Sequence, residues 1–359
     1  MPSPEENKRA IAELREAITN VDRTLLASLE ERARLSRKIH ALIEGGPATI
    51  DVDENVWLRG LEEHATGALT SDSLRAIFKQ VRAEARGIEQ PVRVAYIGPE
   101  GAFGYHLAKN HFGAGATLTE CATVLEALDE VVRGRALYAA FPWESSVEGL
   151  VQSSIAALAN TELFIVGGPQ MRATYDFTTK SGELTDVKRV YATAGAHAAC
   201  ELFLARELPK VAITDVRSPL VAAQLAHESP GGAALLPEAC GRDAELVVTR
   251  SNVGNIPDLS FRYAIAGDRP AMRSGKDITC LLFRVADKPG SLFDVLRHFA
   301  ERGLNLKKLQ SMPTNGATAE YVFYIEVGGH QTDRAVVTAL EEVKREARYL
   351  RVLGSFPVG

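Results

Sequence analysis

Several features that mark exported, membrane-spanning or disulfide-stabilised proteins are missing from this 359-residue chain. It opens with a polar segment that runs into a charged helix, and no apolar run approaches ~18 residues, so we expect a cytoplasmic protein without a membrane span. Cysteines are few, far apart and without a C-x-x-C pair, which argues against a disulfide framework or a metal site. They are Cys121, Cys200, Cys240 and Cys280.

A block of positive charge is also missing. Charged residues make up 24% of the chain and the net charge is −5, so neither nucleic acid nor a membrane is an expected partner. Hydrophobic residues, in contrast, make up 46%, which is enough for packed cores. The length predicts two or three domains.

Residues 8–43 predict one long helix with an apolar seam of the coiled-coil type. The seam breaks between Leu25 and Leu35, where Ser28 and Arg32 occupy the stripe. An arginine there either pairs with a glutamate of another helix or binds a carboxylate ligand, and the sequence leaves both interpretations open. The seam consists of Ile11, Leu14, Ile18, Val21, Leu25, Leu35, Ile39 and Leu42.

Two shorter helices are expected after the long one: one near residues 53–65, and one that starts after Asp72 and runs to about Glu89. Gly45-Gly46-Pro47 ends the first helix, and Thr70-Ser71-Asp72 begins the third. Three helices in about 90 residues enclose only a thin core. We therefore expect this helical domain to complete its core by dimerising.

Residues 138–150 predict a buried strand followed by a helix. The apolar run ends after Phe141, and Pro142 cannot donate a hydrogen bond to a sheet, so we expect the strand to end there. Ser145 or Ser146 would then cap the helix, and the exposed backbone N–H groups would suit a small anion. An ordinary structural cap explains the same residues, so both interpretations stay open.

Strands alternate with helices from residue 92 to 236, which predicts parallel sheets with sites at the C-terminal ends of strands. Gly98 and Pro142 both follow such ends, so we expect them to face one cleft. Besides the strand at 138–141, the predicted strands cover 92–97, 163–166, 187–191, 211–214 and 233–236. The predicted helices cover 103–112, 124–133, 195–208 and 219–226.

The segment from Asp277 onward has the β-α-β-β-α-β order of a ferredoxin-like domain. Its expected strands cover 278–285, 304–309, 320–327 and 352–356. Its expected helices cover 292–302 and 332–347.

The first helix resembles that of the all-helical chorismate mutase domain. The resemblance implies that Arg15 reaches into a partner's site and that Arg32 binds a substrate carboxylate. It also implies that Glu54 and Gln90 belong to the site. The matching residues are Leu14–Ile18, Asp22, Leu25, Leu26 and Arg32.

Two motifs, Tyr96–Gly101 and Phe141–Gly149, resemble the prephenate dehydratase domain. The resemblance implies a two-lobed fold like that of periplasmic solute-binding domains, with prephenate held between the lobes. Such a site must bind two carboxylates and help hydroxide leave as the ring becomes aromatic. The residues that we expect to be catalytic are Glu144, Ser145, Ser260 and Arg262.

The C-terminal domain resembles the ACT regulatory domain that many prephenate dehydratases carry. The matching segments are Lys288–Leu292, Ala300–Leu306 and Glu320–Val327. The resemblance implies phenylalanine binding across a dimer interface, although a purely structural dimerisation module would use the same fold. The implied effector-binding residues are Gly290, Ser291, Leu292, Asn305, Gln310 and Ser311.

Departures from the family motifs keep rival functions open. Ile43 and Asp53 stand where the mutase family has a lysine and an arginine, and losing both cations weakens stabilisation of a dianionic transition state. Aligning Arg262 with the dehydratase family's arginine puts Phe261 in the place of a threonine, whereas a shift by one residue puts Ser260 there and loses the arginine; we prefer the first alignment. Residues 192–195 lack that family's polar groups. The alternatives are a ligand-binding or regulatory protein, or an enzyme with a different reaction on prephenate or a chorismate relative.

Three domains are therefore predicted: all-α and chorismate-mutase-like in 1–90, two-lobed α/β and prephenate-dehydratase-like in 91–270, and a ferredoxin-like α+β ACT domain in 276–359. Their order resembles the bifunctional chorismate mutase–prephenate dehydratase family, which makes phenylpyruvate for phenylalanine biosynthesis. We expect a lyase acting on chorismate and prephenate, without a metal or organic cofactor. We also expect L-phenylalanine as its effector and a homodimer or larger homo-oligomer as its assembly.

Overall fold

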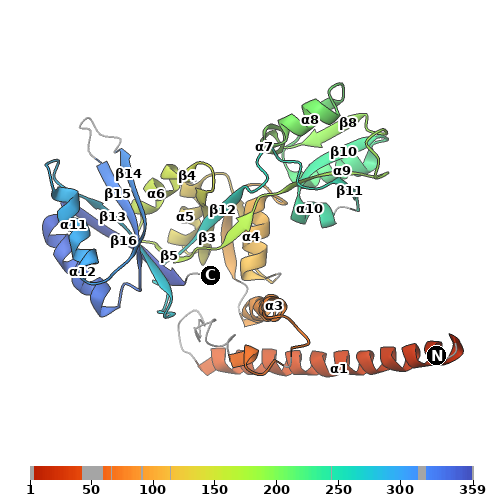
Figure 1. The fold of residues 1–359 in the computed structure, drawn as a ribbon, viewed down its shortest axis with the longest axis horizontal. Helices are drawn as coiled ribbons and strands as arrows, with labels where there is room; N and C mark the ends of the chain where they lie inside the picture. The colour runs from red at the N-terminus through yellow and green to blue at the C-terminus, as the bar shows by residue number, and fades with distance from the viewer. Residues whose placement is uncertain are drawn as a thin grey trace.

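The computed structural model describes residues 4–42, 60–65, 67–89, 92–113, 115–243, 245–313 and 321–357. It contains a helical N-terminal part, two α/β lobes and a C-terminal α+β domain, and the first lobe lies between the second lobe and the C-terminal domain (Figure 1). None of the described helices combines the length and the apolar character that crossing a bilayer requires.

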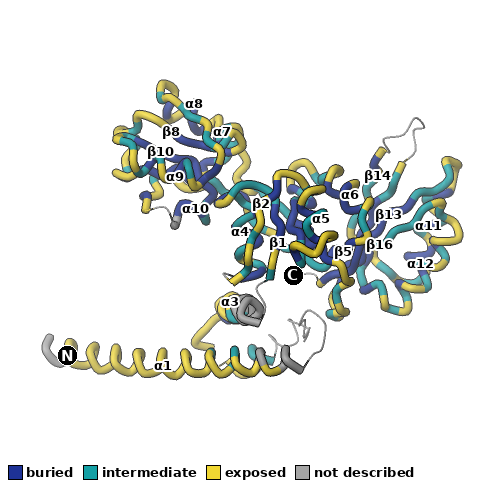
Figure 2. Tube along the Cα trace, turned by 180° about the vertical axis from the view of Figure 1, so that it is seen from behind, coloured by how far each residue is buried: buried dark blue, intermediate teal, exposed yellow. Residues whose placement is uncertain are grey.

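Helix α1 (Pro4–Leu42) confirms the long N-terminal helix, and its apolar seam is exposed. It packs against α3 (Ser71–Glu89), which in turn packs against the first lobe. Figure 2 shows α1 as exposed along almost its whole length. The exposed fractions of the six described seam side chains, from Ile11 to Leu35, range from 50% to 66%. The helix expected at 53–65 lies mostly outside the described residues.

The first lobe is built on one sheet covered by helices. Its strands are β1 (Arg93–Ile97), β2 (Thr117–Cys121), β3 (Tyr138–Ser145), β4 (Gly149–Leu150), β5 (Phe164–Gly167), β6 (Gln170–Arg172) and β12 (Ser260–Gly267). Its helices are α4 (Phe103–Phe112), α5 (Val124–Val132) and α6 (Gln152–Ala159). The main strand order is β2-β1-β3-β12-β5. Because β1 pairs in parallel with β3, the Gly98 and Pro142 regions lie side by side, and their facing one cleft stays a prediction.

The second lobe has a sheet of order β11-β7-β10-β8-β9. Its strands are β7 (Tyr175–Thr179), β8 (Arg189–Ala192), β9 (Ala212–Asp215), β10 (Gly232–Pro237) and β11 (Val247–Arg250). Its helices are α7 (Ala194–Ala199), α8 (Glu201–Glu207), α9 (Pro219–Glu228) and α10 (Glu238–Asp243). The single helix predicted for 195–208 is two helices, because Asn255 binds the backbone at the break. Its backbone N–H donates to the Ala199 carbonyl at 2.6 Å, and its side-chain Oδ1 accepts from Leu202 N at 3.1 Å.

Both sheets of the two lobes are mixed, so the prediction of parallel sheets is only partly right. Strand β12 runs antiparallel to β3, and β7 runs antiparallel to β10. The chain crosses between the lobes from β6 to β7 and returns from β11 to β12. A strand that arrives from the other lobe is not part of a right-handed β-α-β crossover, so nothing forces it to be parallel.

Strand β3 continues through Pro142, and the prediction that it ends there before a serine-capped helix is wrong. The partner strand shifts register between Arg262 and Tyr263, opposite the proline. Such a bulge tolerates a residue that has no N–H to donate. A tight turn into β4 follows instead, in which Ser145 Oγ accepts a hydrogen bond from Glu148 N at 2.9 Å.

The C-terminal domain has the predicted ferredoxin-like order. Its elements are β13 (Asp277–Arg284), α11 (Ser291–Ala300), β14 (Leu306–Pro313), β15 (Tyr321–Gly328), α12 (Arg334–Glu346) and β16 (Tyr349–Pro357). All strand pairs in the sheet, ordered β14-β15-β13-β16, are antiparallel.

One hydrophobic core continues from the first lobe into the C-terminal domain. Trp143 and Ile165 belong to the same buried cluster as Tyr324 and Phe356. The backbones approach so closely that a side chain at Gly354, where φ is +148°, would collide with the Ile165 backbone. The C-terminal domain is therefore packed against the first lobe as part of one core.

Candidate active site

The two lobes meet beside the loop that follows β1. Gly101 has a φ of +84°, and a Cβ there would lie 3.1 Å from Leu220 and 3.3 Å from Cys240, both in the second lobe. The crossing segments are also joined, since Ala173 N donates to Leu259 O at 2.8 Å. A cavity of about 150 Å³ lies at this junction. Its lining residues are Phe103, Met171, Arg172, Thr174, Pro237, Glu238 and Ala239.

Aromatic rings from both lobes gather around Phe103, which lines this cavity. Phe103 begins α4 in the first lobe, and its ring centroid lies 5.1 Å from that of Tyr175 in the second lobe. It also lies 6.3 Å from the ring of Phe261 on β12. Burial raises the pKa of Tyr175 to about 12, so its phenol is neutral at ordinary pH. One side of the cleft is thus apolar.

The polar side of the cavity consists of Arg172, Thr174 and Glu238. Thr174 Oγ1 donates to Glu238 Oε2 at 2.9 Å, and Glu238 N donates to Thr174 O at 3.1 Å. The cavity therefore offers a guanidinium, a hydroxyl and a carboxylate. The sequence reasoning missed all three. The available signal was their position at strand ends, next to the segments that cross between the lobes.

The predicted dehydratase residues come together on β3 and β12, but they occupy two faces of the sheet. Phe261 pairs with Ser145, and Arg262 pairs with Glu144. Opposite residues of an antiparallel pair share a face and successive residues alternate. Ser145 therefore lies on the same face as Phe261 and the cavity. Glu144 and Arg262 lie on the face that meets the C-terminal domain.

On that second face, Glu144 and Arg262 form an ion network with the C-terminal domain. Arg262 Nη2 lies 2.9 Å from Glu144 Oε2, and Arg262 Nη1 donates to Glu326 Oε2 at 3.1 Å. Lys308 forms an ion pair with Glu144. The side chains of Arg262 and Glu326 are only 10% and 3% exposed. Two cations and two carboxylates thus balance each other inside the protein.

The buried pair keeps both of its charges. Burial alone would lower the pKa of Arg262, but hydrogen bonds and the charge of Glu326 outweigh it and raise that pKa above its ordinary value. Burial alone would raise the pKa of Glu326, but hydrogen bonds and charge from Arg262 lower it, with help from Tyr324 and Lys308. Tyr324 supports the pair directly, since its hydroxyl donates to Glu326 Oε1 at 2.7 Å.

The two serines in the predicted set have local structural bonds. Ser145 holds the β3–β4 turn through Glu148 N. Ser260 is tied to Ser146, because Ser146 N donates to Ser260 O at 2.9 Å and Ser260 N donates to Ser146 Oγ at 3.1 Å. Ser260 also pairs with the cavity residue Arg172. The serines therefore fix the strand ends that border the cavity.

The predicted mutase residues are only partly described. Arg15 and Arg32 both lie on α1, and Arg15 is exposed whereas Arg32 is half-buried. They are 32 − 15 = 17 residues apart, which corresponds to about 26 Å along a helix. A small substrate cannot contact both in one chain. Glu54 and Gln90, and the departures Ile43 and Asp53, lie outside the described residues.

Most of the predicted effector-binding residues gather at one end of the C-terminal sheet. Phe323 of β15 pairs with Ser311 on one side and with Phe283 on the other. Phe283 lies near the end of β13, where the chain leads into α11. Ser311 and the N-terminus of α11 are therefore at the same end of the sheet. Gly290, Ser291 and Leu292 form that N-terminus, and Gln310 precedes Ser311. Ser291 Oγ is buried without a hydrogen-bond partner among the described residues. Asn305, before β14, lies at the opposite end.

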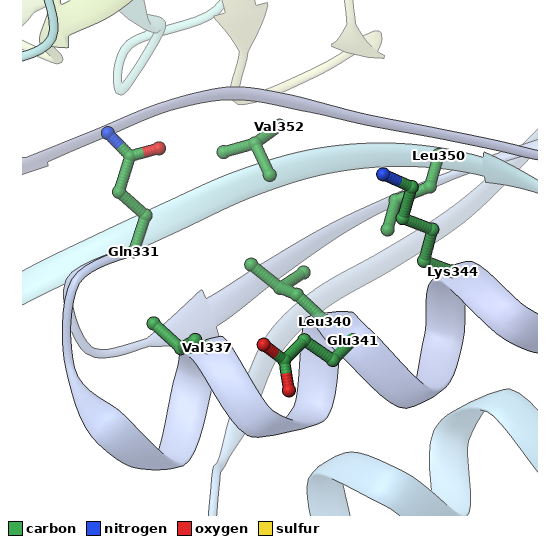
Figure 3. Close-up of a pocket in the computed structure, with 7 residues that line it drawn as sticks. All are labelled: Gln331, Val337, Leu340, Glu341, Lys344, Leu350 and Val352. Atoms are coloured by element: carbon green, nitrogen blue, oxygen red, sulfur yellow. The ribbon is translucent and has the colours of Figure 1, made fainter.

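A second cavity, of about 350 Å³, lies between α12 and β16. Figure 3 shows Val337 and Leu340 of α12 pointing toward Val352, with Glu341 and Lys344 nearby. None of the predicted effector-binding residues lines it. It is thus separate from the predicted effector site.

The structure has two α/β lobes with a small polar and aromatic cavity between them, and a ferredoxin-like domain packs against the first lobe. This architecture is that of a two-lobed small-molecule-binding protein with a regulatory-type domain. Comparisons with known proteins identify the family. Three family models match in order: chorismate mutase type II over residues 14–90, prephenate dehydratase over 94–271 and the ACT domain over 281–345.

Two relatives support these matches. The bifunctional chorismate mutase/prephenate dehydratase of Aquifex aeolicus is 30% identical over 353 residues, 97% of this chain and 98% of that protein. The structure of prephenate dehydratase from Arthrobacter aurescens in complex with L-Phe is 31% identical with a TM-score of 0.63, covering 74% of this chain and 90% of that one. This chain belongs to the bifunctional chorismate mutase/prephenate dehydratase family.

The fold also carries another activity. A solved structure described as GqqA, a novel type of quorum quenching acylase, is 26% identical with a TM-score of 0.62, covering 74% of this chain and 98% of that one. Fold alone therefore does not fix the reaction, and the side chains in the cavity must be considered.

Proposed function

We propose that the chain converts chorismate to prephenate in its helical domain and prephenate to phenylpyruvate in the cleft between the lobes. The observation that carries the second activity is the cavity at the lobe junction, with Arg172, Thr174 and Glu238 on one side and Phe103 on the other. It occurs in a chain whose three domains match the bifunctional enzymes in order.

The chemistry explains why these groups suit prephenate. The bond from the ring to its carboxylate breaks and carbon dioxide is released. Its electron pair enters the ring, and the ring hydroxyl leaves as hydroxide, which takes a proton from solvent to become water. The enzyme needs a cation for the carboxylates, a hydrogen-bond donor for the leaving oxygen and a surface for the new aromatic ring. Arg172, Thr174 and the aromatic side chains supply these three functions.

We assign the leaving-group interaction to Thr174. Phe261 occupies the family's threonine position and contributes no hydroxyl, but the Thr174 hydroxyl lies in the neighbouring cavity that Phe103 lines. It donates to Glu238 in the free protein, and we propose that it turns its proton to the leaving oxygen when prephenate binds. This assignment revises the expected catalytic set. Ser145 and Ser260 fix the strand ends, and Glu144 and Arg262 act from the opposite face.

A Thr174→Val variant tests this assignment. It keeps the shape of the side chain and removes the hydroxyl, so we expect kcat for phenylpyruvate formation to fall by about 10²-fold or more. Thr119→Val, on the exposed strand β2, is the matched control and should keep normal kinetics. Unchanged kcat in Thr174→Val, measured by the absorbance of phenylpyruvate, would rule out this role.

The mutase activity requires a second copy of the chain. Because Arg15 and Arg32 are about 26 Å apart on one helix, a shared site needs Arg15 from one copy and Arg32 from the other. The exposed seam of α1 provides the surface for such a homodimer. L-phenylalanine, which is bound in the Arthrobacter structure, is the proposed effector at the α11 end of the ACT sheet.

One experiment separates this proposal from a binding protein or a different reaction. Purified protein is incubated with chorismate and, separately, with prephenate, and the products are identified by mass and ultraviolet spectrum. We expect prephenate from chorismate and phenylpyruvate from prephenate. Tight binding of prephenate by calorimetry without turnover would instead indicate a binding protein, and any other product would indicate a different reaction.

A further inference from the structure

The ion network described above links two functional regions that belong to different domains. Its first-lobe members, Glu144 and Arg262, lie on β3 and β12, and its ACT members, Lys308 and Glu326, lie on β14 and β15. All four side chains are at most 25% exposed. Buried charges of this kind are rigidly held, because losing one partner leaves another charge without compensation.

On the first-lobe side, each network residue is the direct neighbour of a residue on the cavity face. Ser145 follows Glu144, and Phe261 precedes Arg262. Successive residues of a strand share one backbone, so a displacement of the strand moves the side chains on both of its faces. The network therefore fixes the positions of β3 and β12, which border the cleft, from the face of the sheet that meets the ACT domain.

On the ACT side, the network reaches the strand that carries the predicted effector residues. Lys308 lies two residues before Gln310 on β14. Gln310 Oε1 would lie 4.0 Å from a Cβ at Gly149, so its side chain abuts the β3–β4 hairpin. A displacement of β14 therefore acts on β3 at two points.

A buried hydrogen-bond chain reinforces this contact. Trp143 Nε1, from β3, donates to Tyr324 OH at 3.1 Å, and that hydroxyl donates to Glu326 Oε1 at 2.7 Å. The rings of Trp143 and Tyr324 lie 5.9 Å apart at 60°. Trp143 is thus an intrinsic fluorescent reporter inside the contact.

We propose that Lys308 and Glu326 of the ACT domain are positioning residues for the dehydratase reaction. They hold Glu144 and Arg262, and through them the cleft edges of β3 and β12, in the arrangement that binds prephenate productively. The inference rests on the dehydratase activity proposed above. If so, the ACT domain helps to shape the active site, and a ligand that binds at β14 changes the cleft through these residues.

Lys308→Met and Lys307→Met form the decisive pair of variants. Lys307 is the exposed neighbour on the same strand, so its variant is a matched control. We expect Lys308→Met to lower kcat for prephenate about tenfold, within the range of 5–150-fold typical of coupled sites. Lys307→Met should stay within about twofold of the unaltered chain. Lys308→Arg, which keeps the charge, should restore most of the loss.

A spectroscopic measurement separates positioning from a merely structural role. The chain has two tryptophans, so a Trp57→Phe background leaves Trp143 as the only emitter. Binding of prephenate, recorded before turnover is complete, should shift the Trp143 emission in the Lys307→Met variant. The shift should be at least threefold smaller in Lys308→Met, because without the Lys308–Glu144 ion pair a change at the cleft edge of β3 is no longer carried to the contact that holds Trp143. All assays run below each variant's melting temperature.

Equal kcat and equal emission shifts in Lys308→Met and Lys307→Met would overturn the inference. Absence of phenylpyruvate with the unaltered chain would overturn the dehydratase proposal instead, so the two failures are distinguishable. A loss in Lys308→Met that Lys308→Arg does not restore would also count against positioning by charge.

Discussion

Two contact regions of the molecule have opposite characters. The seam of α1 is apolar and exposed, whereas the contact between the first lobe and the ACT domain is charged and buried. Exposed apolar side chains at regular spacing are costly in water and indicate a surface that another chain covers. Buried ions are costly unless they are paired, and here the pairs are complete within one chain.

The difference shows what each region does. The seam supplies affinity between copies, because apolar burial is strong but not directional. The ion network supplies geometry within a copy, because a guanidinium and two carboxylates must meet at defined distances and angles. We therefore expect mutations in the seam to change assembly, and mutations in the network to change stability and catalysis at fixed assembly.

The largest expected effect is in the network. Glu326→Ala leaves the buried Arg262 guanidinium without its main partner, so the free energy of unfolding should fall by about 3–5 kcal/mol. Urea denaturation measures this free energy of unfolding. Glu341→Ala, an exposed glutamate of α12 in the same domain, should change stability by less than about 0.5 kcal/mol. Similar losses in both variants would contradict the buried-pair interpretation.

A smaller effect is expected in the seam. Ile18→Ala removes apolar area from the proposed dimer interface, and losing most of one such side chain weakens association by about 1.5–3 kcal/mol. Alanine is the strongest helix former, so α1 itself should persist. Sedimentation equilibrium measures the dimer. Leu26→Ala, one position past the seam, is the control, and an equal weakening there would show that the seam is not the interface.

The smallest effect in this series is pH dependence. The pKa of Glu326 is lowered in the folded protein by Arg262, against the effect of burial, from an ordinary value of 4.5. A lowered folded pKa means that the carboxylate's contribution to stability is complete above about pH 4.5 and is lost as pH falls from there toward the folded pKa. Unfolding curves between pH 3 and 7 should show this loss of unfolding free energy at low pH in the unaltered chain, and should not show it in Glu326→Gln.

Much of the fold could be predicted from the sequence. Helix α4 has the predicted bounds, and the third helix ends where predicted but starts two residues earlier, at Ser71. The ferredoxin-like order is also as predicted, because helix periodicity, caps and glycine turns are local signals. The end of β3 at Pro142 was wrong because the strand continues by pairing with β12, about 120 residues later, through a bulge that leaves Trp143 without a register partner there. The break at Cys200 was missed because it depends on Asn255.

The candidate site was predicted less completely. Glu144 and Arg262, two residues of the predicted catalytic set, lie together on one face of the sheet in the structure. Which face borders the cleft depends on how the ACT domain packs against the first lobe. Thr174 and Glu238 carry no motif in the sequence reasoning, because their significance arises only where the two lobes meet.

The sequence by itself determined the three domains, the long α1 seam and the end of β1, because periodicity and turn chemistry act over short distances along the chain. Only the tertiary structure decided that Arg262 serves the domain contact and that Thr174 and Glu238 line the cavity. Long-range pairing between strands and between lobes sets the direction of each side chain, and no local pattern records it.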